Sequence, residues 1–222
     1  MIGKGKSISH GVAALEYDLA KEIDGQAAAT EIARHELYGC TGAEMAQEMK
    51  PYFTDFPNVK NNCLRFEVSP SIEESSSFTD ADWAELGNDF MQRMGLMNHQ
   101  YIIIKHSGTE SKKEQAHLHI LANRISLSGE LYRDNWIGKR ATEAANAIAK
   151  ERNFVQSQDI GKANKEEIKE VMNSVLKKMQ GFDLTKFQEE LGKLGFKVRE
   201  ARASTGKLNG YYVTARSGTE YK

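Results

Sequence analysis

Two strand-like segments joined by a short polar stretch constrain the fold of this chain more than any other feature. Residues 100–105 and 116–125 are rich in isoleucine, leucine and tyrosine, whereas the SGTESKKEQ between them is too polar to pack in a sheet. A third segment, 61–69, alternates apolar residues with arginine, glutamate and serine, which is the period of a half-buried strand. These segments predict neighbouring strands of one sheet.

Helical periodicity occupies much of the remaining chain. Apolar residues repeat at helical spacing over 12–23, and Thr79 is suited to cap a helix that Gly95 ends. Further helices are predicted over 42–50, 139–152, 165–180 and 184–194. The segment 195–218 predicts a hairpin that turns near Thr205 and Gly206. Strands joined directly to strands, with helices grouped between them, favour an α+β fold with an antiparallel sheet.

The predicted strands carry a cluster of histidines. Strand alternation puts His117 and His119 on one face, roughly 6 to 7 Å apart, with Asn123 in line. His106 ends the preceding strand, so three of the six histidines lie within 14 positions. Two imidazoles at this spacing can hold one divalent ion, and His106 is the expected third ligand. The alternative is a solvent-facing strand surface that binds no metal.

Tyr17 is the candidate nucleophile. On the helical wheel of 12–23, it lies about 155° from the centre of the apolar stripe, so its side chain is expected to face away from the core. A phenol is both a modest nucleophile and a good leaving group, which suits a reversible attack on a phosphate. The alternative is an ordinary exposed tyrosine.

Charge is unevenly distributed, although the formal net charge is only −1. Residues 73–89 carry six acidic side chains and no basic one, which is typical of a solvated face. Residues 196–222 carry six basic side chains against two acidic ones. We therefore expect phosphate contacts from the C-terminal hairpin, notably Lys197, Arg199 and Arg202.

Composition limits the remaining classes of protein. No stretch approaches the roughly 18 apolar residues of a membrane span, and the N-terminus lacks the apolar core of a signal peptide, so a cytoplasmic protein is expected. Cys40 and Cys63 form no CxxC pair, so they predict no cysteine zinc site. We expect a catalytic sheet domain over 1–155 and a helical and hairpin extension over 156–222 that packs on it.

The run KH, followed by HLHILANRI, resembles the third motif of conjugative and mobilization relaxases, which are nucleases of the histidine-sheet (HUH) type. The resemblance implies an α+β fold with a central antiparallel sheet of about five strands and flanking helices. It also implies that one Mg²⁺ or Mn²⁺ ion is held by His106, His117 and His119. Asn123 and Arg124 would close the motif, as a catalytic residue and a DNA contact.

One departure from the family pattern concerns the first histidine. The loop 107–116 is longer than is usual in the family, and it contains Gly-Thr where Asp-Thr is common. Glu110 and Glu114 therefore stay open as alternative third ligands, because carboxylate oxygen suits a hard cation.

Two other segments resemble relaxase motifs. SISHGVAALEYDLAKE is similar to the first motif, which implies that Tyr17 is the nucleophile; His10 is either a rival nucleophile or, as we favour, a DNA contact. LRFEVSPSIEE is similar to the second motif, in which a serine at the position of Ser69 touches DNA near the nick. Glu67 shares that strand face and could orient a metal-bound histidine by a hydrogen bond, without binding the metal itself.

Together these motifs imply a DNA relaxase of a plasmid or a Bacteroides-type mobilizable element. Such an enzyme makes a site- and strand-specific nick at a transfer origin and stays joined to the 5′ end through phosphotyrosine, for conjugative mobilization. The implied partners are single-stranded origin DNA and accessory mobilization and coupling proteins in the bacterial cytoplasm, and a longer native protein is expected. The alternatives are a non-catalytic origin-binding protein and a replication-initiator or transposase nuclease of the same superfamily.

Overall fold

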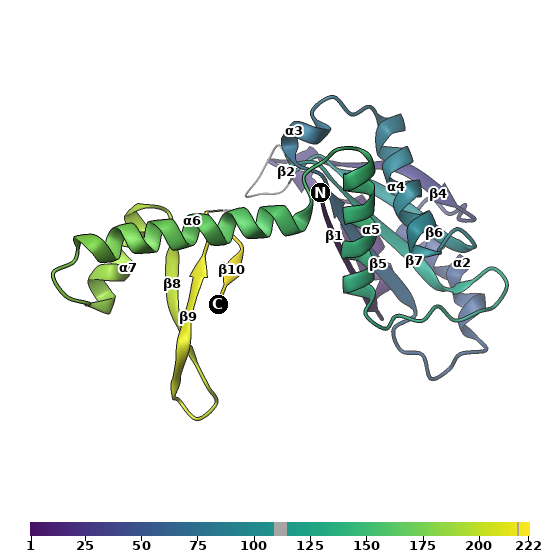
Figure 1. Cartoon of the computed structure of the whole chain (residues 1–222). Helices are drawn as coiled ribbons and strands as arrows, with labels where there is room; N and C mark the ends of the chain where they lie inside the picture. The colour runs from purple at the N-terminus through teal and green to yellow at the C-terminus, as the bar shows by residue number, and fades with distance from the viewer. Residues whose placement is uncertain (109–114, 217) are drawn as a thin grey trace. The chain divides into compact units, whose positions relative to one another are not determined.

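Residues 1–108, 115–216 and 218–222 are described by the computed structural model, and the chain divides into two units, Met1–Ser157 and Gln158–Lys222 (Figure 1). The strands of the first unit are β1 (Ile2–Ile8), β2 (Glu22–Ile23), β3 (Gln26–Ala27), β4 (Ala29–His35), β5 (Cys63–Ser69), β6 (His99–His106) and β7 (His117–Ser126). Its helices are α1 (Gly11–Leu19), α2 (Gly42–Met49), the 3₁₀ helix η1 (Lys50–Phe53), α3 (Ile72–Ser75), α4 (Asp80–Met94) and α5 (Ile137–Glu151).

Five of these strands form one antiparallel sheet in the order β1-β5-β7-β6-β4. The central strand β7 pairs with β5 on one side and with β6 on the other, so the segment with two histidines lies in the middle of the sheet. The sequence analysis predicted the three inner strands and an α+β class, and both predictions are confirmed.

Helices cover both faces of this sheet. On one face, Phe66 of β5 and Ile120 of β7 pack in a core with Phe90 of α4 and Ile148 of α5, and Figure 1 shows these two helices in front of the strands. On the other face, the smaller core includes residues of α1, α2, β6 and β7, such as Leu15. This second face also carries the histidines, which lie beyond the edge of that core.

The edge strand β1 was not predicted from the sequence, because glycines face its neighbouring helix where apolar side chains were expected. A Cβ atom at Gly3 would lie 2.5 Å from the carbonyl oxygen of Ala141, and one at Gly5 would lie 3.1 Å from the Cβ of the same alanine. The helix α5 therefore packs almost directly on the backbone of β1. Lysines alternate with these glycines, and they lie on the face of the histidines.

The predicted helix over 12–23 is too long. Helix α1 ends at Leu19, and Glu22–Ile23 forms the short strand β2, which pairs with β3. Asp24 and Gly25 connect these strands with φ angles of 53° and 74°. An Asp-Gly pair readily adopts positive φ at both positions of a tight hairpin turn, so this local signal prevails over the helical spacing of Ile23.

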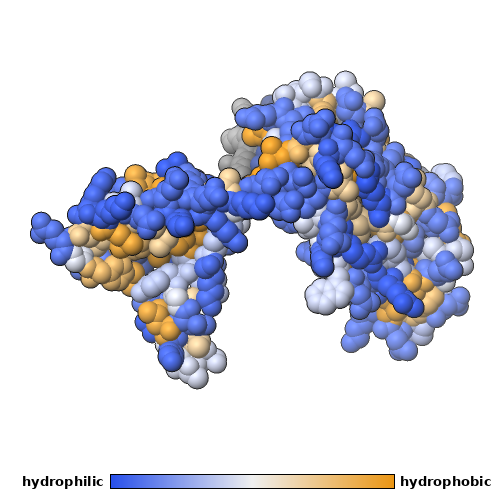
Figure 2. All heavy atoms as spheres, viewed as in Figure 1, coloured by the Kyte–Doolittle hydropathy of each residue, from blue (hydrophilic) through white to orange (hydrophobic). Residues whose placement is uncertain are grey.

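The second unit has a three-stranded antiparallel sheet in the order β10-β9-β8. Its elements are α6 (Ser157–Lys178, which begins at the last residue of the first unit), α7 (Leu184–Lys193), β8 (Lys197–Arg202), β9 (Leu208–Thr214) and β10 (Glu220–Tyr221). Residues of α6 and α7 pack on this sheet around Phe196, and Figure 2 shows hydrophilic side chains along the outer side of α6. The predicted hairpin is confirmed, with its turn at Thr205 and Gly206.

The two units differ in charge. Residues 158–222 contain 13 lysines and arginines against nine acidic residues, a net charge of +4. Residues 1–157 contain 17 basic against 22 acidic residues, a net charge of −5. Every described helix is too short or too polar to span a bilayer.

Candidate functional site

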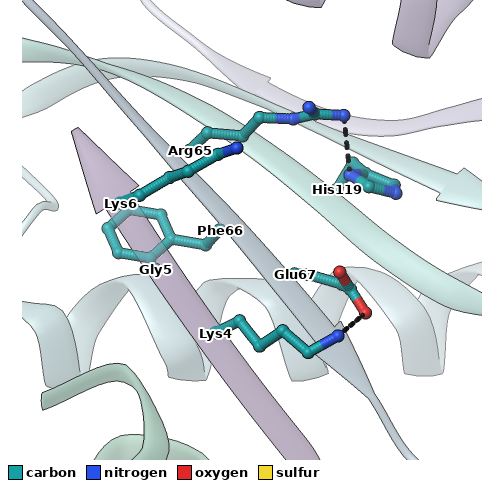
Figure 3. Close-up of a pocket in the computed structure, with 7 residues that line it drawn as sticks. All are labelled: Lys4, Gly5, Lys6, Arg65, Phe66, Glu67 and His119. Atoms are coloured by element: carbon teal, nitrogen blue, oxygen red, sulfur yellow. Dashed lines mark hydrogen bonds and ion pairs between the residues drawn. The ribbon is translucent and has the colours of Figure 1, made fainter. Parts of the chain in front are cut away.

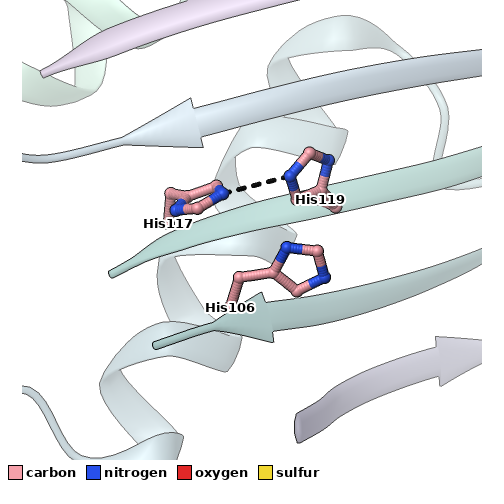
Figure 4. Close-up of side chains that lie close together, drawn as sticks. All are labelled: His106, His117 and His119. Carbon is pink, nitrogen blue, oxygen red and sulfur yellow. Dashed lines mark hydrogen bonds between the residues drawn. The ribbon is translucent and has the colours of Figure 1, made fainter. Parts of the chain in front are cut away.

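Three histidines converge on one face of the first unit's sheet (Figure 4). His106 at the end of β6 is directly opposite His117 at the start of β7, and His119 lies two residues further along the same face. The Nε2 atoms of His117 and His119 are 3.1 Å apart, and one ring nitrogen from each of the three lies within 4.8 Å of the others. The structure thus brings together the three predicted metal ligands.

Neighbouring carbonyl groups orient two of these rings. The Nδ1–H group of His117 donates to the carbonyl of Gln115 at 3.1 Å, so its lone pair is on Nε2, which faces Nε2 of His119. The Nε2–H group of His106 donates to the carbonyl of Asp18 at 2.8 Å, which leaves its Nδ1 lone pair free.

Burial keeps two of the rings neutral. It lowers the pKa of His106 from 6.5 to about 4, and nearby cationic groups add to the effect. Burial likewise lowers the pKa of His119 to about 2, with a further contribution from its histidine neighbours. A neutral imidazole is the form that binds a metal, so this site needs little proton release before it takes up a cation.

The residues present fit a divalent cation. Three imidazoles with ring nitrogens this close can occupy one side of a metal ion, and oxygen atoms of water or substrate would complete the coordination that Mg²⁺ or Mn²⁺ prefers. The alternative ligands Glu110 and Glu114 lie outside the described residues. His106 is in place to serve without them.

An ion pair behind the triad holds helix α1 against the sheet. Asp18 of α1 is 2% exposed, and its carboxylate accepts a hydrogen bond from Arg65 of β5 at 2.5 Å. The same carboxylate is 3.8 Å from Nδ1 of His119, and Arg65 is 3.3 Å from that nitrogen. Burial raises the pKa of Asp18, while the adjacent guanidinium lowers it. Asp18 therefore contacts the triad through both its carboxylate and its carbonyl.

Tyr17 immediately precedes this anchor. Its side chain is 58% exposed, as the helical wheel predicted, whereas Ala14, Leu15 and Asp18 of the same helix are buried. His10 lies at the other end of α1, where it is exposed and occupies the cap position. The helix thus puts Tyr17, rather than His10, at the end that contacts the metal ligands.

A basic groove lies between the triad and the edge strand β1 (Figure 3). This pocket of about 210 Å³ is lined by Lys4, Gly5, Lys6, Arg65, Phe66, Glu67 and His119. Glu67 is opposite His119 in the strand register, but its carboxylate accepts a hydrogen bond from Lys4 at 2.9 Å. The carboxylate nearest to His119 in the ion pairs of the described residues belongs to Asp18 instead.

Ser69 is linked to the triad through one residue. It is buried at the end of β5, and its hydroxyl oxygen accepts a hydrogen bond from the side chain of Gln115 at 3.2 Å. The carbonyl of Gln115 in turn holds His117. Ser69 is therefore close to the site but engaged within the protein.

Asn123 and Arg124 lie away from the triad. Asn123 is four residues beyond His119, about 13 Å along the strand, and is fully buried. Its amide donates to Met49 and Gln100 and accepts from the backbone of Ile125, so these contacts hold the end of α2 against the strands.

Arg124 is also engaged within the protein. Its guanidinium donates to two backbone carbonyls and to the carboxylate of Asp134 at 2.7 Å. Both side chains are thus engaged within the protein, and the catalytic role of Asn123 and the DNA contact of Arg124 stay predictions.

The basic residues of the hairpin lie in the second unit. Arg199 is paired with Glu220 at 2.6 Å, and Arg202 with Glu200 at 2.5 Å, while Lys197 is exposed at the start of β8. The two arginines therefore have carboxylate partners already.

Sequence reasoning missed Asp18, Arg65 and the lysines of β1. An acidic residue next to the candidate nucleophile was visible, but nothing in the sequence shows that it faces β5. Arg65 and Glu67 had been placed on the polar face of a strand, and that face proves to be the face of the triad.

An antiparallel sheet with a largely buried histidine triad, anchored to a helix that exposes a tyrosine, defines a candidate metal-dependent enzyme. The comparison with protein families makes the class specific: residues 17–154, more than half of the chain, match the family described as relaxase, MobA/VirD2-like, nuclease domain. The chain belongs to this relaxase family. A search of curated proteins finds no match.

Two solved structures of the conjugative relaxase TrwC in complex with oriT DNA are similar to the chain. The metal-bound structure has a TM-score of 0.40 and 12% sequence identity, and the alignment covers 94% of this chain and 75% of the TrwC chain. The metal-free structure has a TM-score of 0.42 and 9% sequence identity, and the alignment covers 94% of this chain and 74% of the TrwC chain. The family assignment rests on the family model, which includes α1 from Tyr17 onward and all three histidines.

Proposed function

We propose that this protein nicks one DNA strand at a transfer origin by attack of Tyr17 on the scissile phosphate, as a step in conjugative mobilization. The observation that carries the proposal is the anchoring of α1. The carbonyl of Asp18 accepts a hydrogen bond from His106, so the adjacent, exposed Tyr17 is tied to the metal site.

The reaction forms one bond and breaks another. The phenolic oxygen of Tyr17 bonds to phosphorus, the bond from phosphorus to the 3′ oxygen breaks, the phenolic proton is released to water, and the 3′ oxygen takes up a proton. The 5′ end stays attached as a phosphotyrosine, and the reverse step rejoins the strand. A divalent cation held by His106, His117 and His119 would offset the negative charge that develops on the phosphate.

The proposal includes the biological setting that the family implies. The substrate is single-stranded DNA at the transfer origin, the metal is Mg²⁺ or Mn²⁺, and accessory mobilization and coupling proteins act with it in the bacterial cytoplasm. The family match and the histidine triad support the nuclease part of this proposal.

The test is covalent adduct formation with a labelled oligonucleotide that carries the origin of the protein's own element. Tyr17→Phe removes only the attacking oxygen from an exposed side chain, so it should abolish the adduct and leave DNA affinity nearly unchanged. Tyr38→Phe is the matched control, because Tyr38 is 76% exposed and should react normally when changed.

Other outcomes separate the alternatives. An adduct that persists in Tyr17→Phe would transfer the role to His10 or another residue. DNA binding without any adduct in the wild-type protein, at saturating metal, would instead indicate a non-catalytic origin-binding protein.

A further inference from the structure

We propose that Lys6, together with Lys4 and Arg65, binds the phosphodiester that neighbours the scissile one on the same DNA strand. The strand would then leave the active site across β1. The inference rests on the proposed function and adds a binding site to it. The lysines lie on β1, which precedes the family-matched residues 17–154.

The strand register places these cations beside the triad. Lys4 pairs in register with Glu67, which pairs with His119. One step further along the sheet, Lys6 pairs with Arg65, which pairs with Leu121. Since neighbouring strands are about 4.8 Å apart, the row of Lys4 extends from His119 to the β1 edge of the sheet, and the row of Lys6 runs beside it.

The charges in the groove are unequally compensated. Lys4 is balanced by Glu67, and Arg65 by Asp18. Lys6 is exposed, and within the described part of the chain it makes no ion pair. The groove therefore has one cation in excess among the described residues, and that cation is the exposed Lys6.

Arg65 gives the groove a fixed inner end. Its guanidinium points toward His119 in Figure 3 and is held by the buried carboxylate of Asp18. Its Nε atom is buried and has no acceptor among the described residues. An anion in the groove would offer oxygen acceptors to a cation whose orientation is already set.

A phosphodiester is the anion that fits this position. A DNA strand with one phosphate at the triad must place its neighbouring phosphates on either side of it, and the groove opens directly beside His119. Half or more of protein–DNA hydrogen bonds reach the phosphates and sugars, and they fix the position of the strand. Lys6 would thus set the register in which the scissile phosphate reaches Tyr17.

The first measurement is DNA affinity without metal, so that no cleavage occurs. The probe is a fluorescein-labelled oligothymidylate of about 20 nucleotides, titrated in EDTA at several salt concentrations. Lys6→Ala should weaken binding by about threefold to tenfold and lower the salt slope by about 0.7. Lys6→Arg should restore both values, because it keeps the charge.

The matched control is Lys139→Ala, which removes an exposed lysine of α5 on the opposite face of the sheet. It should leave both affinity and salt slope close to those of the wild type. Lys6→Ala is preferred to Arg65→Ala, because the arginine also anchors α1. Thermal unfolding should show that Lys6→Ala is folded.

The second measurement locates the contact. A series of origin oligonucleotides, each with one neutral methylphosphonate, should include one near the cleavage position that weakens binding by the wild type but not by Lys6→Ala. The proposal would be overturned if Lys6→Ala lost no more affinity than Lys139→Ala. It would also be overturned if the wild type and Lys6→Ala were equally sensitive to every methylphosphonate. Failure of the proposed nicking reaction would appear differently, as absence of a Tyr17 adduct with binding intact.

Discussion

His106 and His117 each donate a hydrogen bond to a backbone carbonyl, but they do so through different ring nitrogens. Nε2 of His106 donates to Asp18, so its lone pair is on Nδ1, whereas His117 donates through Nδ1 and has its lone pair on Nε2. The hydrogen bond from α1 therefore fixes the tautomer of the ligand that the sequence left least certain. A change at His106 would disturb both the metal and the helix that carries Tyr17.

Metal binding gives a direct test of the triad. His117→Ala should weaken Mn²⁺ binding by at least about tenfold, because two imidazoles hold a divalent ion poorly, and His106→Ala should do the same. Calorimetric titration with Mn²⁺ measures this, and His35→Ala is a control outside the triad. Unchanged affinity in His106→Ala alone would assign the third ligand to a carboxylate.

The depressed histidine pKa values predict how the metal-free protein responds to acid. Between the ordinary pKa of 6.5 and about 4, the unfolded chain binds a proton at His106 and the folded chain does not. From His106 alone, the free energy of unfolding should therefore fall as the pH is lowered through this window, by about 2 kcal/mol at pH 5, and the depressed pKa of His119 should add a loss of the same sign.

Urea unfolding in EDTA at a series of pH values checks this expectation. His119→Gln removes one of the two depressed groups and should show a smaller loss between pH 7 and pH 5. A free energy of unfolding that is flat over this interval would show that the rings are not held neutral.

At the level of elements, β1 and α5 pack with almost no space between their backbones. Gly3→Ala should lower the free energy of unfolding by about 1 to 3 kcal/mol, because its Cβ would meet the backbone oxygen of Ala141 at 2.5 Å. Gly138→Ala, on the same helix, should change it by less than about 1 kcal/mol, since its Cβ would lie 3.4 Å from the nearest atom. Urea denaturation of both variants compares them, and equal losses would contradict the packing described.

Sequence patterns predicted the elements whose own residues carry a strong signal. The cap residue Thr79 and the terminal Gly95 fixed the limits of α4, and alternation identified β5 and β7. The strand β1 could not be predicted, because its glycines acquire meaning only when α5 packs on them.

At the candidate site too, the residues with a local sequence signal were predicted, and those that depend on tertiary contacts were not. Strand alternation and the neighbouring strand end predicted the three histidines, which the structure brings together. Alternation also aligned Asn123 with them, but it could not show that this side chain bonds to Met49 at the end of α2 and to Gln100. Asp18 was missed because its role depends on the contact of α1 with β5, which the helical wheel of α1 alone does not contain.

At the level of the whole molecule, the hairpin arginines should contribute less to DNA binding than their number suggests. Neutralising Lys197, Arg199 and Arg202 together should lower the salt slope of binding by about 0.7, as expected for one phosphate contact, because both arginines are already paired with glutamates. Lys197→Ala alone should give most of this effect. A decrease of about 2 in the triple variant would show that the arginines exchange their carboxylates for phosphates.

The division of charge between the units has a consequence for the speed of encounter. A net charge of −1 conceals a unit of +4 and a unit of −5, so a polyanion that approaches from a distance is attracted by residues 158–222 and repelled by residues 1–157. Electrostatic attraction acts mainly on the association rate, and dissolved salt screens it beyond about 10 Å at 0.1 M. If the protein binds DNA as proposed, added salt should slow capture of the strand, and first contact should occur through the basic unit before the strand reaches the histidines.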